Sequence, residues 1–267
     1  MMSLLSESGL RLLESVCFAR TLFAFDFDGT LARIEKDPAG ARIAPSTLGL
    51  LLRLNELAPV AVISGRTLAD LKSKFSSEPA FLVGNHGLQG LGNKRTQQTA
   101  FAEQCQRWRS ELEPWLQRSA ILDGVELEDK CFSLAIHFRN SRAKGRARME
   151  IRRKLGELAP APKVIPGKCV FNVVPEGGPH KGVALLELMR RIGVSSAFYI
   201  GDDDTDEDVF TLPDDGLFTA RVGRKAASAA RFYIDRQRDV NELLARLIEF
   251  HRPALQAPRR RARAEKR

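Results

Sequence analysis

Three short apolar runs, each ending in a polar cluster, constrain the fold of this chain more than any other feature. Thr21–Phe25 leads into Asp-Phe-Asp-Gly-Thr, Val60–Ile63 leads into Ser-Gly-Arg, and Ala197–Ile200 leads into Gly201 and a run of aspartates. Continuous apolar runs of this length are typical of strands that are buried on both faces of a parallel sheet. Ligands bind such sheets outside the carboxyl ends of the strands. The pattern therefore predicts that all three polar clusters lie at one edge of a parallel sheet.

Helical patterns separate the apolar runs. They cover residues 45–57, 68–75 and 181–191. Strands that alternate with helices predict an α/β fold with an open, Rossmann-like parallel sheet.

The middle of the chain has a different pattern. Apolar and more polar residues alternate over 132–139, a second candidate strand covers 169–174, and helical patterns cover 103–116 and 144–158. This arrangement predicts a small α+β module inserted into the parallel-sheet domain, with hinges near 88–93 and 175–179. We expect a core of residues 1–92 and 175–252, an inserted module of residues 93–174, and a basic, disordered tail of residues 253–267.

Length and composition exclude several classes of protein. A chain of 267 residues fits two domains, or one domain with a large insertion, and 43% hydrophobic with 28% charged residues is ordinary for a globular protein. We find no apolar stretch long enough for a membrane span and no secretory signal pattern. The four cysteines lack metal-binding spacing. We therefore expect a cytoplasmic protein with reduced thiols and without membrane contact.

The net charge of +9 is concentrated at the end of the chain. Residues 258–267 hold six basic residues against one glutamate, so the rest of the chain carries only about +4. A short basic tail is usually solvated, and a nucleic-acid partner is not expected. A non-enzymatic protein that binds polyanions through this tail remains an alternative.

Two aspartates one residue apart follow the first apolar run. Asp26 and Asp28 can both reach one ligand at a strand end, but an Asp-Gly pair is equally compatible with a solvated turn. Six acidic residues within 202–208 follow the third run and would repel one another without a divalent ion. Carboxylate oxygens without nearby thiolates favour Mg²⁺. The dipole of a helix N-terminus would explain Glu207 and Asp208, but not the whole cluster.

Two further polar positions complete a set suited to phosphoryl transfer. Ser64 offers a hydroxyl at a strand end, and Gly65 allows a ligand to approach closely. Lys181 opens a helix, where backbone amides already favour an anion. Together with the carboxylates, these groups can supply a nucleophile, an acid/base, oxyanion donors and a metal site.

In this order the residues resemble the four motifs of the haloacid dehalogenase superfamily, and in detail the trehalose-phosphate phosphatases. The resemblance covers about residues 20 to 250. It rests on these motifs: Asp26-Phe-Asp-Gly-Thr30, Ser64-Gly-Arg66, Gly84-Asn-His-Gly87, Glu128-Asp-Lys130 with His137-Phe-Arg139, Pro166-Gly-Lys168, Lys181-Gly182 and the acidic run from Gly201.

The resemblance implies a catalytic role for four residues. Asp26 would attack phosphorus and form an aspartyl phosphate, Asp28 would act as acid and base, and Ser64 and Lys181 would bind the phosphoryl oxygens. Mg²⁺ would be held by the Asp26 carboxylate, the Asp28 carbonyl and Asp202. Asp203 and Asp206 would lie behind these ligands.

The resemblance also implies a sugar-binding cap formed by the inserted module. The substrate-binding residues would be Gly65, Arg66, Asn85, His86, Arg139, Lys168 and Asn172. The family usually has Glu at the position of Asn172 and commonly at that of Gln89. We predict that His137 is structural and that Trp108 and Trp115 pack within helices.

The resemblance implies a Mg²⁺-dependent phosphatase that hydrolyses trehalose 6-phosphate. A phosphatase for another glycosyl phosphate, such as a sucrose, mannosylglycerate or glucosylglycerol phosphate, is the nearest alternative. We expect a monomer whose partner is a small sugar phosphate.

Overall fold

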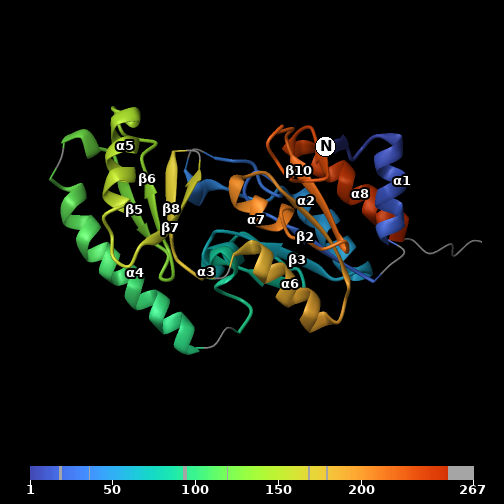
Figure 1. Ribbon diagram of the computed structural model, residues 1–267. Helices are drawn as coiled ribbons and strands as arrows, with labels where there is room; N and C mark the ends of the chain where they lie inside the picture. The colour runs from blue at the N-terminus through green and yellow to red at the C-terminus, as the bar shows by residue number, and fades with distance from the viewer. Residues whose placement is uncertain are drawn as a thin grey trace, which may run out of the picture.

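The chain folds around two separate sheets, which a computed structural model shows for residues 1–17, 20–35, 37–92, 95–118, 120–167, 169–178 and 180–251 (Figure 1). The larger sheet has seven parallel strands in the order β1-β11-β10-β9-β2-β3-β4. Its strands are β1 (Met2–Ser3), β2 (Thr21–Phe25), β3 (Val60–Ile63), β4 (Phe81–Val83), β9 (Ser196–Gly201), β10 (Leu217–Val222) and β11 (Phe232–Ile234). The parallel α/β fold predicted from the sequence is therefore confirmed. The predicted tail of residues 253–267 lies outside the described residues.

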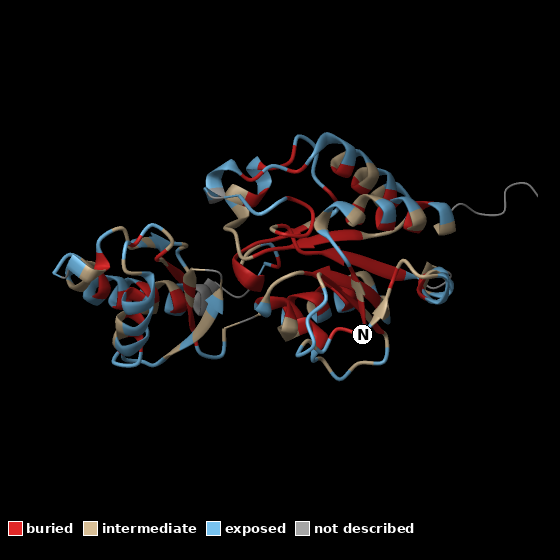
Figure 2. Cartoon of the chain, turned by 90° about the horizontal axis from the view of Figure 1, so that it is seen from above, coloured by how far each residue is buried: buried red, intermediate tan, exposed pale blue. Residues whose placement is uncertain are grey.

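Helices cover both faces of the large sheet, so its central strands are buried throughout (Figure 2). One face packs against α1 (Glu7–Cys17), α2 (Pro45–Leu57), α3 (Leu68–Ser73) and α8 (Val240–His251). The other face packs against α6 (Lys181–Ile192) and α7 (Glu207–Phe210). Side chains alternate along each strand, so Phe23 and Phe25 point to the first face and Leu22 and Ala24 to the second. We call this layered body, residues 1–92 and 176–251, the large unit.

The second sheet is antiparallel and has the order β5-β6-β8-β7. Its strands are β5 (Glu126–Asp129), β6 (Leu134–His137), β7 (Pro162–Gly167) and β8 (Val170–Pro175), and it packs against α4 (Arg95–Leu116) and α5 (Lys144–Leu155). The two helices cover one face only, where Trp108 is fully buried and Trp115 packs at the margin, as predicted. We call residues 95–175 the small unit; Figure 1 shows it beside the large unit.

The sequence predicted two of the four strands in the small unit. β5 is mostly charged and β7 contains two prolines, so neither has the apolar pattern of a buried strand. Both lie at the edges of the sheet, where proline and charged residues are tolerated.

Short 3₁₀ turns complete the chain. They are η1 (Pro38–Gly40), η2 (Asn85–Gly87), η3 (Ala120–Leu122), η4 (Asp204–Asp206) and η5 (Gln237–Asp239). Two of them, η2 and η4, follow strands of the large sheet at its carboxyl edge and carry residues singled out in the sequence.

Candidate active site

The carboxyl edge of the large sheet brings together the predicted polar clusters. Asp26 directly follows β2 and continues its alternation, so its side chain points to the face covered by α6. Lys181 is the first residue of α6. Its Nζ donates to Asp26 Oδ1 at 2.7 Å and to Asp206 Oδ1 at 2.8 Å, and all three side chains are buried.

Asp206 is fully engaged by protein donors. Besides Lys181, its Oδ1 accepts from the hydroxyl of Tyr199 at 2.6 Å, and its Oδ2 accepts from the Asp203 backbone N–H at 2.9 Å. Its carboxyl group lies so close to Gly201 that a Cβ there would meet it at 2.1 Å. Asp206 therefore holds the lysine and the η4 turn in place.

Among the described carboxylates of this group, Asp202 has an oxygen without a hydrogen-bond partner. It lies with Asp26 and Asp206 in a group whose ligand oxygens are within 4.8 Å of one another, and its buried Oδ1 has no hydrogen-bond partner among the described residues. Its other carboxyl oxygen lies against Gly29, which has a φ of +81° and leaves no room for a Cβ. An orphaned buried oxygen beside two other carboxylates fits a hard divalent cation with oxygen ligands.

The pKa values in this group shift in the direction expected for excess negative charge. Burial, with Asp206 and Asp203 adding to it, raises the pKa of Asp202 to about 7. Burial also raises the pKa of Asp26, although Lys181 opposes the shift. Burial alone would lower the pKa of Lys181, but Asp206 and Asp26 raise it above its ordinary value. Three carboxylates share one ammonium, so a divalent cation would relieve the repulsion.

Asp28 follows Asp26 in the turn after β2, and Arg66 binds its carboxylate. Arg66 Nε donates to Asp28 Oδ2 at 2.7 Å and NH2 donates to Oδ1 at 2.6 Å. NH1 donates to Asp70 Oδ2 at 2.6 Å. The resemblance implies that Arg66 binds substrate, whereas in the structure it bonds Asp28, the candidate acid/base.

Ser64 and His86 line the same edge. Ser64 is buried, and its Oγ accepts from the Arg66 backbone N–H at 3.2 Å. The imidazole of His86 lies against Gly65, where a Cβ would meet it at 2.5 Å. Burial and the cations Lys181, Lys130 and Lys163 lower the pKa of His86, which favours the neutral ring.

The predicted sugar-binding residues of the small unit have different positions. Asn172 lies on β8 opposite Ala135 and Ile165, on the sheet face away from the helices. Arg139 NH1 reaches the Glu35 carbonyl of the large unit at 3.0 Å. Lys168 lies outside the described residues. His137, predicted to be structural, contacts Glu128 Oε2 through Nε2 at 2.9 Å.

The end of the acidic run has structural contacts. Asp203 caps η4, Glu207 accepts from Arg221 at 3.2 Å and from the Ala229 N–H at 2.9 Å, and Asp208 pairs with Lys163 of the small unit at 3.3 Å. Sequence reasoning did not find Tyr199 or Arg221. Tyr199 is part of an apolar run, and Arg221, which donates to the Asp203 carbonyl at 3.0 Å, lies inside the apolar strand β10.

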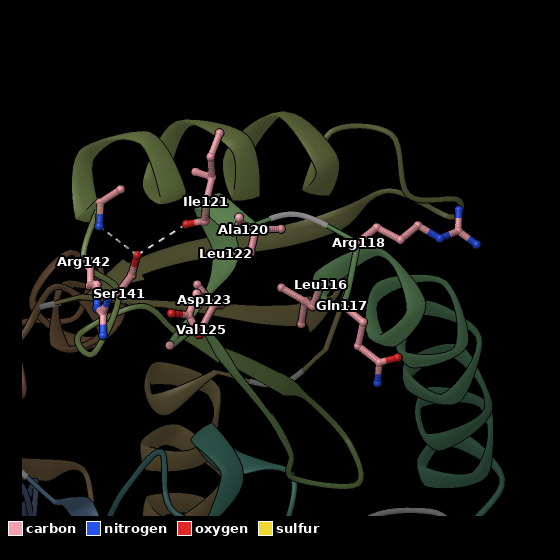
Figure 3. Close-up of a pocket in the computed structure, with 12 residues that line it drawn as sticks. Leu116, Gln117, Arg118, Ala120, Ile121, Leu122, Asp123, Val125, Ser141 and Arg142 are labelled. Carbon is pink, nitrogen blue, oxygen red and sulfur yellow. Dashed lines mark hydrogen bonds between the residues drawn. The ribbon is translucent and has the colours of Figure 1, made fainter.

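A cavity of about 700 Å³ in the small unit is separate from this edge (Figure 3). It is bordered by the end of α4, by η3 and by the start of α5, and it shares no lining residue with the carboxylate group. The buried Ser141 hydroxyl at its wall donates to the Ile121 carbonyl at 3.4 Å and accepts from the Ala143 N–H at 3.2 Å. These local contacts occupy the Ser141 hydroxyl.

Comparisons with known proteins identify a matching family model and several relatives of similar sequence. The family model for trehalose-phosphatase matches residues 24–229. The trehalose-phosphate phosphatase of Mycobacterium tuberculosis strain H37Ra is 30% identical over 252 residues, and that of Mycolicibacterium paratuberculosis is 31% identical over 255 residues. The matches cover 86% and 84% of this chain but only 62% and 61% of those relatives.

Solved structures with a similar fold include the C-terminal domain of a Candida albicans trehalose-6-phosphate phosphatase. That structure has a TM-score of 0.68 at 22% identity, with 90% of this chain and 96% of that chain covered. An Aspergillus fumigatus trehalose-6-phosphate phosphatase has a TM-score of 0.59 at 25% identity, with 93% and 99% covered. No helix in the described part of the chain has the length and apolar character needed to cross a membrane.

Proposed function

The chain belongs to the trehalose-phosphatase family, and we propose that it hydrolyses trehalose 6-phosphate to trehalose and inorganic phosphate with Mg²⁺ as cofactor. The observation that carries the chemistry is the buried contact of Lys181 with both Asp26 and Asp206 beside the unpartnered oxygen of Asp202. A solvated turn does not need a buried lysine between two carboxylates. A polyanion-binding protein would leave this arrangement unexplained.

In the first step, Asp26 is the nucleophile. Lys181 engages Oδ1, and Oδ2 accepts no hydrogen bond from the described residues, so Oδ2 is available to attack phosphorus. An O–P bond forms at Asp26 while the bond from phosphorus to the sugar oxygen breaks. Asp28 donates its proton to that oxygen, and the sugar leaves as an alcohol.

In the second step, water attacks the aspartyl phosphate. Asp28, now ionised, accepts a proton from the water, phosphate leaves, and the Asp26 carboxylate is restored. The bidentate contact with Arg66 fixes the orientation of the Asp28 carboxyl group. Ser64 and Lys181 would hold the phosphoryl oxygens in both steps.

The metal site would use three groups: the Asp26 carboxylate, the Asp28 carbonyl and Asp202. Asp203 and Asp206 would support them from behind, since Asp206 has its oxygens occupied by protein donors. Bound Mg²⁺ would neutralise charge on the phosphoryl oxygens. The residues present fit this role, because the carboxylates are close together and no cysteine belongs to their group in the described part of the chain.

The small unit would be the cap that covers the sugar, with residues 93–174 as the inserted domain and the remainder of 1–252 as the core. Its helix-free sheet face carries Asn172 and Lys163, and Lys163 already contacts Asp208 of the large unit. We assign Asn172, Arg139 and Lys168 to the sugar, with Gly65 and His86 at the phosphate end. A cap that closes over the substrate excludes water from the phosphoryl group.

A second candidate substrate is another glycosyl phosphate, because this chain departs from the family pattern at two positions. Asn172 stands where the family usually has Glu. Gln89 also replaces a common Glu, but its Oε1 accepts from the Leu68 N–H at 2.7 Å at the start of α3, so it has a structural contact here. Asn172 is therefore the position that bears on substrate choice.

Phosphate release from a panel of sugar phosphates tests the proposal. The panel should contain trehalose 6-phosphate, sucrose 6-phosphate, mannosylglycerate and glucosylglycerol phosphates, and glucose 6-phosphate, each with and without Mg²⁺. We expect the highest kcat/KM for trehalose 6-phosphate. A higher value for another disaccharide phosphate would move the substrate assignment, and no release from any of them would refute the phosphatase proposal.

A further inference from the structure

A turn of the small unit, residues 130–133 between β5 and β6, is seated on a buried asparagine of the large unit. Asn85 is fully buried, and its Nδ2 donates to the Lys130 carbonyl at 2.7 Å. In return, the Ser133 hydroxyl donates to Asn85 Oδ1 at 2.6 Å, and Ser133 is only 1% exposed. One side-chain amide thus bonds the small unit through both its donor and its acceptor.

Asn85 is itself fixed to the large unit. Its φ is +50°, in the left-handed region that asparagine tolerates better than most residues, and its backbone N–H donates to the Arg66 carbonyl at 2.6 Å. Arg66 uses its guanidinium to hold Asp28. The loop that seats the small unit is therefore bonded to the residue that aims the candidate acid/base.

A second contact of the same turn reaches the neighbouring loop. Lys130 Nζ donates to the Gly65 carbonyl at 3.4 Å, next to Ser64. Two further bonds between the units, from Arg139 to the Glu35 carbonyl and from Lys163 to Asp208, are exposed. A buried polar pair is costly to break, because each group loses its partner without gaining water, whereas exposed pairs exchange with solvent at little cost.

We propose that Asn85 is a positioning residue that sets where the small unit lies over the site, rather than a ligand of the sugar. The pair with Ser133 fixes the start of β6, and the sheet continues from there to Asn172, which is paired with Ala135 on β6. Loss of the bonds between Asn85 and the 130–133 turn would displace the sugar-binding face of the small unit and leave the group of Asp26, Asp202 and Asp206 intact. This inference rests on the proposed function, since it concerns a substrate that reaches from the phosphate site to the small unit.

The test compares two substrates in the full chain. Ser133→Ala removes the donor from the small unit with little change in shape, and Ser110→Ala, at an exposed position of α4, is the matched control. We expect Ser133→Ala to lower kcat/KM for trehalose 6-phosphate about tenfold, equivalent to about 1.4 kcal/mol. Hydrolysis of p-nitrophenyl phosphate, which has no sugar to be positioned, should change less than about twofold, and the control should change neither.

A second variant separates seating from other effects. Asn85→Gly keeps the positive φ accessible, so the loop can retain its conformation. We expect the double variant with Ser133→Ala to be no worse on trehalose 6-phosphate than Asn85→Gly alone, because both remove the same interaction. Additive losses, or parallel losses on both substrates for Ser133→Ala, would overturn the inference.

Hydrogen exchange gives a readout that does not depend on the substrate. Amides of β6 should exchange faster in Ser133→Ala than in wild type, while those of β2 and β9 should not change. If wild type hydrolyses p-nitrophenyl phosphate but not trehalose 6-phosphate, the proposed function fails. Hydrogen exchange still tests whether Asn85 positions the small unit. Unchanged exchange in β6 would refute the inference that Asn85 positions the small unit.

Discussion

Arg66 holds Asp28 by two parallel hydrogen bonds, of 2.7 Å from Nε and 2.6 Å from NH2. Its remaining nitrogen bonds Asp70, and Lys74 contacts the same carboxylate at 3.1 Å. Burial would raise the pKa of Asp70, but the bonds from Arg66 and Lys74 lower it below its ordinary value. The guanidinium is thus anchored at one side and presents a planar fork to Asp28, a geometry that lysine cannot reproduce.

We predict that Arg66→Lys lowers kcat for trehalose 6-phosphate about 10- to 100-fold, because Asp28 loses its bidentate orientation. Steady-state kinetics with Mg²⁺ present would measure this, with exposed Arg53→Lys on α2 as the control. If KM rises while kcat stays at the wild-type value, Arg66 binds the substrate instead of orienting Asp28.

Asp26→Asn should lower turnover at least about 1000-fold, because the amide keeps the shape but cannot attack phosphorus. The fold should survive, since the amide oxygen can still accept from Lys181. Phosphate release and circular dichroism would measure the two effects, and Asp215→Asn, at an exposed position, is the control. Activity within tenfold of wild type would contradict the aspartyl-phosphate mechanism.

Removal of metal should abolish activity and make stability depend on pH. The pKa of Asp202 is raised by burial and neighbouring carboxylates to about 7, above its ordinary value. A carboxyl group with a raised pKa stabilises the fold below about pH 4, and this contribution is lost as pH rises through 7. The Tm of the EDTA-treated protein should therefore fall between pH 5 and pH 8.

Addition of Mg²⁺ should reverse that loss, since a bound cation stabilises the ionised carboxylates. We expect the rise in Tm on addition of Mg²⁺ to be larger at pH 8 than at pH 5.5, as measured by thermal unfolding. An equal rise at both pH values would show that the cation binds elsewhere, and full activity in EDTA would refute the metal assignment.

The sequence predicted three strands of the large sheet, β2, β3 and β9, and the polar residues at their carboxyl ends, because an uninterrupted apolar run followed by polar residues is a local pattern. The other four strands of that sheet, β1, β4, β10 and β11, were not predicted. The sequence also did not predict β5 and β7, whose charged and proline-containing sequences are permitted only because the strands lie at sheet edges. Whether a strand lies at a sheet edge depends on the topology of the whole sheet, so it cannot be predicted from the sequence of that strand alone.

Roles within the site were harder to predict, because they depend on contacts between distant segments. The alternation over 132–139 places Ser133 and Ala135 among the more polar positions of the strand, but both are buried. In particular, Ser133 is buried against Asn85, 48 positions away in the sequence. In the sequence, Tyr199 is one more residue of the apolar run that forms β9. Only the fold shows that its hydroxyl donates a hydrogen bond to Asp206. The sequence of an alternating strand does not indicate which distant residue each of its side chains contacts.

Asn172→Glu should improve the use of trehalose 6-phosphate. Asn172 is flanked by Phe171 and Val173, which point into the core of the small unit, so its own side chain lies on the opposite, helix-free face. A carboxylate there would accept charge-assisted hydrogen bonds from sugar hydroxyls, about twice as strong as those of an amide. We expect KM to fall about tenfold while kcat changes less than about twofold, because the distal sugar is far from the reacting phosphorus. Gln106→Glu, the same change of amide to carboxylate at an exposed position of α4, should alter neither constant. If Asn172→Glu instead leaves KM unchanged for trehalose 6-phosphate and raises it for another glycosyl phosphate that wild type prefers, then Asn172 was matched to that sugar, and the substrate assignment fails while the phosphatase mechanism stands.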